Sequence, residues 1–497
     1  MIKKLIRNYF FLLIIICVIA FFLRFYQIAK LPPGFYPDEA MYANNGAEAW
    51  ETSDFKVFYP ENFGREGLWP NIIGFFITKF GREPWVPRSI AAMFGIFTVL
   101  GVYFLTKELF SKKIALLASF FIATSFWHIN FSRIGFRAIM APFFLTWGIY
   151  FLLLALRQIK EQKSPKFYIL NSILSGVFYG LGFHTYIAYR ITPLLILTVI
   201  LVSWFKNKEK EIRRKILLSA FCFLLSAFIV AAPLGIYFLK NPQDFLGRTS
   251  QISVFSSPTL IKDLSLNILK TAGMFNFAGD QNWRHNYAGR PELFWPAGLL
   301  FLLGIFLGIK SIVKQIQKSE FVILFSWLVL TALPIVISNE SLPHALRAIL
   351  MIPPVFVLAG VGGGWLYEQF TKLRIFANKR TKMALLSILG LISSLLIFEA
   401  YNTYFIKWGQ NPNTYGAFSA NYVEIGRQLN ALPKNLPKYV VVEARGADVR
   451  GLPMPTQTVM FITDTFTPKK QKEKNIFYLL PEQINQIPEN GYIVILK

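Results

Sequence analysis

Two adjacent carboxylates, Asp38 and Glu39, directly follow the first long apolar segment of the chain, within the stretch LPPGFYPDEA. Carboxylates at the edge of a membrane are partly desolvated and titrate at shifted pH, which suits a general base or a metal ligand. The pair also suits the start of a helix, with Asp38 as N-cap and Glu39 in the first turn, facing the positive end of the helix dipole. The two roles are compatible, because a capped carboxylate is held rigid and ionised.

Two arginines, Arg133 and Arg137, lie in the stretch HINFSRIGFR, where two apolar segments are predicted to meet at a membrane surface. An arginine at the hydrocarbon edge is costly unless it snorkels to the headgroups or binds an anion. Its planar guanidinium can hold a phosphate through two hydrogen bonds. A lipid-linked phosphate is therefore the candidate ligand, and snorkelling is the alternative.

Two later segments also combine cationic and hydrogen-bonding side chains. The stretches FAGDQNWRHNYAGRP and SNESLPHALR fit either an anion and sugar site or ordinary ordered turns. Their candidate residues are Asp280, Asn282, Arg284, His285, Asn286 and Arg290 in the first stretch, and His344 and Arg347 in the second. The histidines of the chain are too scattered in the sequence to predict a zinc cluster built at short spacing.

The composition indicates a membrane protein. Of 497 residues, 54% are hydrophobic and only 16% are charged, against about 25% charged in soluble proteins. The net charge of +25 comes from short runs of lysine and arginine between apolar segments, so it indicates cytoplasmic loops and excludes a nucleic-acid-binding face. Cys17 and Cys222 lie inside apolar runs, so neither a disulfide framework nor a cysteine-based zinc site is expected.

Eleven apolar segments, each about 17–25 residues long, can cross a bilayer as helices. They cover roughly residues 9–29, 86–106, 114–130, 138–156, 167–184, 190–205, 216–238, 293–309, 320–338, 347–369 and 383–405. The first has no signal-peptidase site after it, so we expect it to be retained, with the N-terminus in the cytoplasm. With alternate threading, every connection assigned to the inside is basic. These connections hold Lys107, Lys112 and Lys113; Arg157, Lys160, Lys163 and Lys166; Lys206, Lys208, Lys210, Arg213, Arg214 and Lys215; Lys310, Lys314 and Lys318; and Lys372, Arg374, Lys379, Arg380 and Lys382.

The outer side then receives two large loops, about 31–85 and 239–292, and a C-terminal region. The first loop is acidic, and the spacing of its apolar residues predicts short amphipathic helices along the membrane surface. Residues 406–497 contain four short apolar runs, which predict strands of an external α/β domain. These runs are 439–443, 458–463, 476–480 and 492–496. The predicted protein is thus a polytopic α-helical membrane domain, 1–405, followed by an extracytoplasmic α/β domain, 406–497.

The four polar motifs occur in an order that resembles a known family. The PDEA, SRIGFR, GDQNWRHN and PHALR elements are together similar to the bacterial branch of the GT-C glycosyltransferases, the protein O-mannosyltransferase and aminoarabinose-transferase superfamily. The resemblance covers about residues 1–405. It implies a multi-pass enzyme of the plasma (inner) membrane that takes a sugar from a polyprenyl phosphate on the outer leaflet. Transfer to a hydroxyl of a protein, lipid or envelope glycan would invert the anomeric carbon.

The resemblance also implies roles for individual residues. Asp38 would be the general base, and Glu39 would support it or help it to hold a divalent cation; no other cofactor is expected. The candidates for the donor phosphate are Arg133, Arg137, Arg284, His285 and Arg347, and the candidates for other substrate contacts are Asp280, Asn282, Asn286 and His344.

Two other functions remain open from the sequence. A lipid-linked-sugar transporter or flippase would bind its substrate near the midplane, whereas the ionisable residues here concentrate at predicted outer ends. An envelope glycan ligase or polymerase would share the membrane architecture but use another acceptor. The lack of a phosphate-binding glycine loop and of a cytoplasmic globular domain favours a lipid-linked donor over a nucleotide sugar.

Overall fold

The computed structural model describes residues 9–245, 254–316, 318–373 and 378–497. Each of the eleven predicted spans contains a helix. These helices are α2 (Tyr9–Phe25), α5 (Trp85–Leu109), α6 (Lys112–Thr124), α8 (Met140–Lys160), α9 (Pro165–Gly182), α10 (Pro193–Lys206), α11 (Lys210–Lys240), α14 (Trp295–Val313), α15 (Lys318–Val336), α16 (Ile352–Lys372) and α17 (Lys379–Tyr401). Within the described residues, eight candidate spans are long and apolar enough to cross a membrane, and α2 is a shorter apolar helix. The prediction of a multi-pass helical membrane protein is confirmed.

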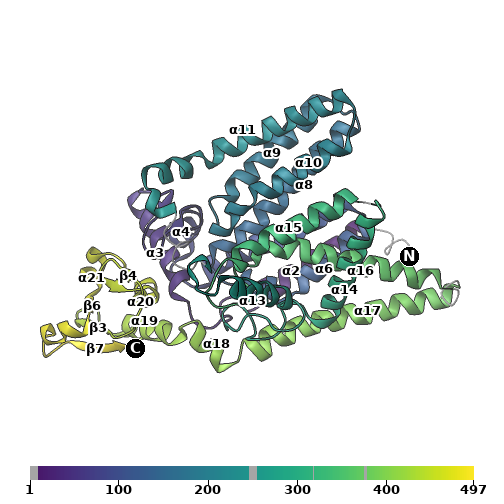
Figure 1. The fold of residues 1–497 in the computed structure, drawn as a ribbon. Helices are drawn as coiled ribbons and strands as arrows, with labels where there is room; N and C mark the ends of the chain where they lie inside the picture. Colours follow the sequence, from purple (N-terminus) through teal and green to yellow (C-terminus); the bar gives the residue numbers. More distant parts are fainter. Residues whose placement is uncertain (1–8, 246–253, 317, 374–377) are drawn as a thin grey trace.

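The helices run side by side, and consecutive ones are antiparallel (Figure 1). Small residues let some of them approach closely. A Cβ placed on Gly304 of α14 would lie 2.0 Å from the carbonyl oxygen of Leu358 in α16, so only glycine fits this contact. The outer surface is apolar, for example at Phe221 and Phe228 of α11, which are 62% and 70% exposed. Such a surface suits lipid rather than water.

One end of the bundle carries the polar elements. The connection between α2 and α5 forms α3 (Pro37–Thr52), the strands β1 (Phe58–Tyr59) and β2 (Arg65–Glu66), and α4 (Leu68–Phe80). Two helices are thus present where amphipathic ones were predicted. However, α3 does not lie free along a membrane surface, because most of its residues are buried between α4 and the C-terminal region. The connections that hold the basic runs lie at the opposite end (Figure 1). Residues 1–8 and Arg374 lie outside the described part of the chain.

The second large loop approaches the same polar end. It contains α13 (Leu260–Gly273), which packs on α15, and then a segment without regular structure up to α14. The predicted span 114–130 is interrupted, because Ser125 has extended backbone angles between α6 and α7 (Phe126–Phe131). This interruption turns His128 and Asn130 into the protein interior, where both are buried.

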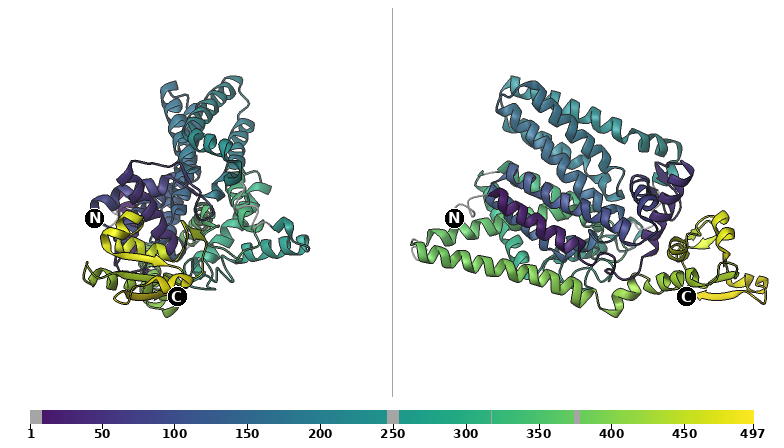
Figure 2. Two further views of the ribbon diagram at one scale, coloured as in Figure 1. Left: turned by 90° about the vertical axis from the view of Figure 1, so that its left-hand side faces the viewer. Right: turned by 180° about the vertical axis from the view of Figure 1, so that it is seen from behind.

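The C-terminal region is a small α/β unit beside α3 (Figure 2). After α17 the chain continues as a π-helical turn, η6 (Asn402–Trp408), so the predicted domain division at 405/406 falls inside this turn. Next come α18 (Pro412–Ala417) and α19 (Ala420–Ala431), and then a parallel sheet in the order β6–β3–β7. Its strands are β3 (Lys438–Val442), β6 (Ile476–Leu479) and β7 (Tyr492–Leu496).

The strand predicted at 458–463 is wrong. These residues belong to a helix, α20 (Thr456–Thr463), which packs against α19 and α3. A short, mostly apolar run is ambiguous between a buried strand and a buried helix, and here tertiary packing selects the helix. The unit is completed by the hairpin of β4 (Asp448–Val449) and β5 (Leu452–Pro453) and by α21 (Pro468–Lys474).

Candidate active site

A cavity of about 740 Å³ lies at the polar end of the bundle. Its walls come from α3, the turn before β2, the segment before α8, the 3-10 helix η2 (Ile187–Ile191), the loop before α14 and the connection from α15 to α16. Seven of the predicted site residues line it: Asp38, Arg137, Asn282, Arg284, His285, His344 and Arg347. The fold thus brings together residues from all four motifs.

Asp38 is the second residue of α3 and is partly exposed to the cavity. The N-cap is Tyr36, and Pro37 is the first helical residue, so the prediction of Asp38 as N-cap is wrong. The Oδ1 atom of Asp38 accepts a hydrogen bond of 2.9 Å from Nδ2 of Asn62. In the first helical turn, the carboxylate still lies near the positive end of the helix dipole. Asp38 therefore presents an oriented carboxylate to the cavity.

Glu39 has a different environment from Asp38, although the two are adjacent. Its side chain is fully buried, and it accepts hydrogen bonds from Arg88 Nε at 3.0 Å and Nη2 at 3.1 Å. The backbone N–H groups of Gly135 and Tyr36 donate to it at 2.8 Å and 3.2 Å. Both oxygens are therefore occupied by protein groups. This corrects the assignment of Glu39 as a catalytic or metal-binding partner of Asp38: it fastens α3 to α5.

Arg133 is also buried behind the cavity rather than in it. It donates hydrogen bonds to the carbonyl oxygens of Arg24 and Leu31, at 2.7 Å and 2.9 Å, and lies over the rings of Tyr404 and Phe405. Its guanidinium thus supports the chain where it leaves α2. Neither the phosphate nor the snorkelling interpretation of Arg133 fits this position.

Five arginines line the cavity, and most have a protein partner. Arg137 pairs with Glu66 at 3.0 Å, Arg65 pairs with Glu61 at 3.3 Å, and Arg347 pairs with Glu340 and contacts Ser338. Arg190 donates to the carbonyl oxygen of Phe245 at 2.7 Å.

Arg284 and Arg190 differ from the other three arginines, because neither has a carboxylate partner within the described residues. Arg190 donates to a backbone carbonyl oxygen, whereas the buried Nε of Arg284 has no hydrogen-bond acceptor there. Its guanidinium lies 3.9 Å from the centre of the Tyr36 ring, next to the start of α3. The aromatic face holds the guanidinium in place without neutralising it. Arg284 is therefore the cavity arginine best prepared to receive an anion.

Asp280 lies behind the cavity wall and forms a compact group with His285 and His344, which line the cavity. Oδ2 of Asp280 lies 3.0 Å from Nδ1 of His285 and 3.8 Å from Nδ1 of His344. One ligand atom from each residue lies within 4.8 Å of the others, so the group could hold a metal ion. Burial lowers the pKa of His285 below its ordinary value, although Asp280 opposes the shift. The expectation that the histidines are scattered is therefore wrong for this pair, which the fold brings together from two loops.

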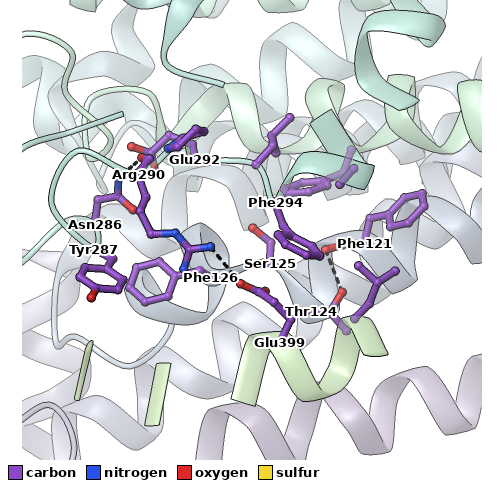
Figure 3. Close-up of a pocket in the computed structure, with 15 residues that line it drawn as sticks. Phe121, Thr124, Ser125, Phe126, Asn286, Tyr287, Arg290, Glu292, Phe294 and Glu399 are labelled. Atoms are coloured by element: carbon purple, nitrogen blue, oxygen red, sulfur yellow. Dashed lines mark hydrogen bonds and ion pairs between the residues drawn. The ribbon is translucent and has the colours of Figure 1, made fainter. Parts of the chain in front are cut away.

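Asn286 faces away from the large cavity. It lines a second, small cavity of about 30 Å³ behind the loop, and its Nδ2 donates to the carbonyl oxygen of Arg290 at 2.6 Å. Arg290 is directed toward Glu399 of α17 (Figure 3), and its Nη2 lies 3.1 Å from Oε1 of Glu399. Glu292 accepts from the backbone N–H of Asp280 at 3.0 Å, and burial raises its pKa well above the ordinary value. Asn286, Arg290 and Glu292 thus hold the loop in place rather than contact the large cavity.

Several cavity residues were not predicted from the sequence. Tyr42 lies one helical turn after Asp38, and this spacing could have indicated it. Arg190 begins a predicted span, so the argument used for Arg137 applies to it as well. Nothing in the sequence marks Asn62 and Arg65 as cavity residues, because a polar residue in an acidic loop is usually solvated.

A protein-family model matches part of the chain. Residues 68–237 match the family described as dolichyl-phosphate-mannose-protein mannosyltransferase. No curated protein sequence matches the chain.

Solved structures share the fold at low sequence identity. ArnT from Cupriavidus metallidurans, bound to undecaprenyl phosphate, has a TM-score of 0.58 and 14% identity, and the match covers 97% of this chain and 92% of that one. The oligosaccharyltransferase of Archaeoglobus fulgidus, in complex with zinc and sulfate, has a TM-score of 0.55 and 15% identity, over 95% of this chain. The match spans only 62% of the oligosaccharyltransferase. Residues 68–237 are therefore similar to the mannosyltransferase family, and the chain as a whole shares the fold of ArnT and of the archaeal oligosaccharyltransferase.

Proposed function

We propose that this protein is an inverting glycosyltransferase that moves a sugar from a polyprenyl phosphate to an acceptor hydroxyl on the outer side of the plasma (inner) membrane. One observation carries the proposal: Asp38, a carboxylate oriented by Asn62, shares a cavity with Arg284, an arginine without a carboxylate partner in the described chain. These are the two groups that such a transfer needs, a base for the acceptor and a cation for the departing phosphate.

The reaction is a single displacement. Asp38 takes the proton of the acceptor hydroxyl, and the acceptor oxygen forms a bond to the anomeric carbon. The bond between that carbon and the phosphate oxygen breaks, and the phosphate leaves with the electron pair near Arg284. Among the described residues, the acidic ones that line the cavity are Asp38 and Glu340, and Glu340 is paired with Arg347. A double displacement would need a second carboxylate as nucleophile, so the arrangement favours inversion.

The apolar part of the cavity wall supports a lipid-linked donor. Ile187 and Ile191 of η2 face the cavity together with Leu333 and Ile337, which lie at the end of α15. Helix α15 also contributes apolar side chains to the exposed surface of the bundle, such as Val329, which is 61% exposed. A polyprenyl chain could therefore follow apolar surface from the bilayer to the arginines.

The charge distribution supports an outer location for the cavity. The basic connections lie at the opposite end of the bundle, and basic connections face the cytoplasm in most membrane proteins. By this argument residues 406–497 form an extracytoplasmic domain. The acceptor, which could be a protein, a lipid or a glycan, would then approach from that side.

The donor chemistry of the Asp280, His285 and His344 group fits a divalent cation. A carboxylate and two imidazoles are the ligand set of many zinc sites, and burial favours the neutral imidazole that ligation requires. A cation bound there would add positive charge to the wall that also holds Arg284. The backbone N–H of Ala345 donates a 2.8 Å hydrogen bond to Asp280, which would keep the carboxylate oriented.

The proposal can be tested by replacing Asp38 with asparagine in the purified protein. Transfer from a polyprenyl-phosphate sugar should fall by about 10²–10⁴-fold, the usual contribution of a general base, while melting temperature stays unchanged. Asp54→Asn, in an exposed position of the same loop, should keep wild-type activity. Arg284→Ala should weaken the binding of polyprenyl phosphate, whereas Asp38→Asn should not. Full activity of Asp38→Asn would rule out the proposed base.

A further inference from the structure

We infer that the β4–β5 hairpin of the C-terminal unit positions the candidate base Asp38, and that Arg450 at the hairpin tip is the positioning residue. The inference rests on the proposed function, because it assumes that Asp38 removes the acceptor proton. It gives the C-terminal unit a role in the reaction, although no residue of that unit lines the large cavity.

The hairpin tip presents Arg450 to the first outer loop. Arg450 and Gly451 have φ of 58° and 82°, the conformation of a two-residue turn that suits a tight hairpin. The two terminal nitrogens of Arg450 donate to the carboxylate of Glu48 at 2.8 Å and 2.7 Å. Its Nε donates to Glu61 at 2.9 Å, and its guanidinium lies 4.4 Å from the centre of the Phe466 ring. These contacts hold two carboxylates of the loop on one cation.

Glu61 links Arg450 to residues that line the cavity. Its other oxygen accepts hydrogen bonds from Asn45 at 3.2 Å and from the cavity residue Arg65 at 3.3 Å. The next residue, Asn62, donates the 2.9 Å hydrogen bond to Asp38. Arg450 is therefore separated from Asp38 by one ion pair, one peptide unit and one hydrogen bond.

The turn that contains Asn62 needs support from outside. Asn62, Phe63 and Gly64 have φ of 48°, 65° and 84°, so three consecutive residues are in the left-handed region. Non-glycine residues adopt this region only where the surroundings impose it. The Arg450–Glu61 ion pair holds the residue directly before the turn. Without it, Glu48 and Glu61 would also lack their common counter-charge.

The loss of Arg450 should therefore affect the base rather than the donor. We expect Arg450→Gln to lower kcat about tenfold at neutral pH and to leave the affinity for polyprenyl phosphate unchanged, because Arg284 comes from another segment. The acidic limb of the rate–pH profile should move to higher pH, since a carboxylate that loses a hydrogen bond to its charged form is protonated more readily. A purely structural role would lower the amount of folded protein without moving this profile.

A double-mutant cycle tests whether Arg450 acts through Asn62. Asn62→Ala should produce the same loss and the same shift of the profile, and the double variant should be no worse than either single variant. Arg427→Gln, at an exposed position of α19, is the matched control and should behave as wild type. If Arg450→Gln does not fold, Arg450→Lys serves instead. It should fold and give intermediate activity, since a lysine keeps the positive charge but cannot make the paired hydrogen bonds of the guanidinium.

Two results would overturn the inference: wild-type kcat and profile in Arg450→Gln, or losses in the two single variants that multiply in the double variant. These failures are distinct from failure of the proposed function. An inactive Asp38→Asn together with a normal Arg450→Gln would remove only the positioning role. A fully active Asp38→Asn would remove the proposed base itself.

Discussion

Adjacent residues Asp38 and Glu39 should have opposite mutant phenotypes. Glu39→Gln removes one partner of an ion pair in which both side chains are fully buried, and it leaves Arg88 without a counter-charge. Breaking a buried pair on one side costs about 3–5 kcal/mol. Glutamine also places an amide NH₂ at the position of one carboxylate oxygen, where it faces the backbone N–H of either Gly135 or Tyr36. We therefore expect a loss of stability at the upper end of this range.

The assay compares stability and activity per folded molecule. Thermal unfolding in detergent should show a clearly lower melting temperature for Glu39→Gln, whereas Asp38→Asn should melt like wild type. The folded fraction of Glu39→Gln should transfer sugar within about threefold of the wild-type rate, because its carboxylate does not line the cavity. Arg88→Met should be similarly unstable, and the Glu39→Gln/Arg88→Met pair should lose less than the sum of the two, since no buried charge is left unpaired. A stable Glu39→Gln with an activity loss of a hundredfold would refute this reasoning and return Glu39 to the reaction.

Two further predictions concern Glu292, behind the cavity, and His344, in its wall. Glu292→Gln should raise the melting temperature at pH 8 and change it little at pH 4. The pKa of Glu292 is raised in the folded state, so its stabilising contribution is complete below the unfolded pKa and is lost as the pH rises toward the folded pKa, whereas glutamine stays neutral throughout. Equal shifts at both pH values would contradict this prediction. Zinc at a hundredfold excess over Kd should stabilise the wild-type protein by about 2.7 kcal/mol and so raise its melting temperature, and it should not do so in His344→Ala. An unchanged zinc response in that variant would place the ion elsewhere.

The bundle could be predicted from the sequence because its signal is local. A long apolar run has to become a helix in lipid, where no water can satisfy the backbone, and each of the eleven predicted runs contains one. The failure at α20 has the opposite cause. Its run is short, mostly apolar and without a clear period, so the contacts with α3 and α19 decide its conformation.

The separation of Asp38 from Glu39 could not be predicted from the sequence. Successive residues of a helix point about 100° apart, so one of two neighbouring carboxylates can face a cavity while the other is buried. Which one does so depends on Arg88, which is far along the chain. The group formed by Asp280, His285 and His344 depends in the same way on two loops meeting at the polar end. Pairings of this kind are tertiary, and spacing along the chain does not encode them.

The acidity of the loop between α2 and α5 has a physical explanation that does not involve catalysis. A cavity walled by several arginines is unfavourable unless counter-charges are present before any substrate binds. Glu61 and Glu66 of this loop supply them to Arg65 and Arg137. An incoming phosphate would have to compete with these carboxylates for either arginine, and the competition would cancel most of the gain. Among the described residues it meets no such competitor at Arg284, whose guanidinium is held by an aromatic ring instead. The paired arginines therefore shape the wall, and the donor phosphate should be bound mainly at Arg284.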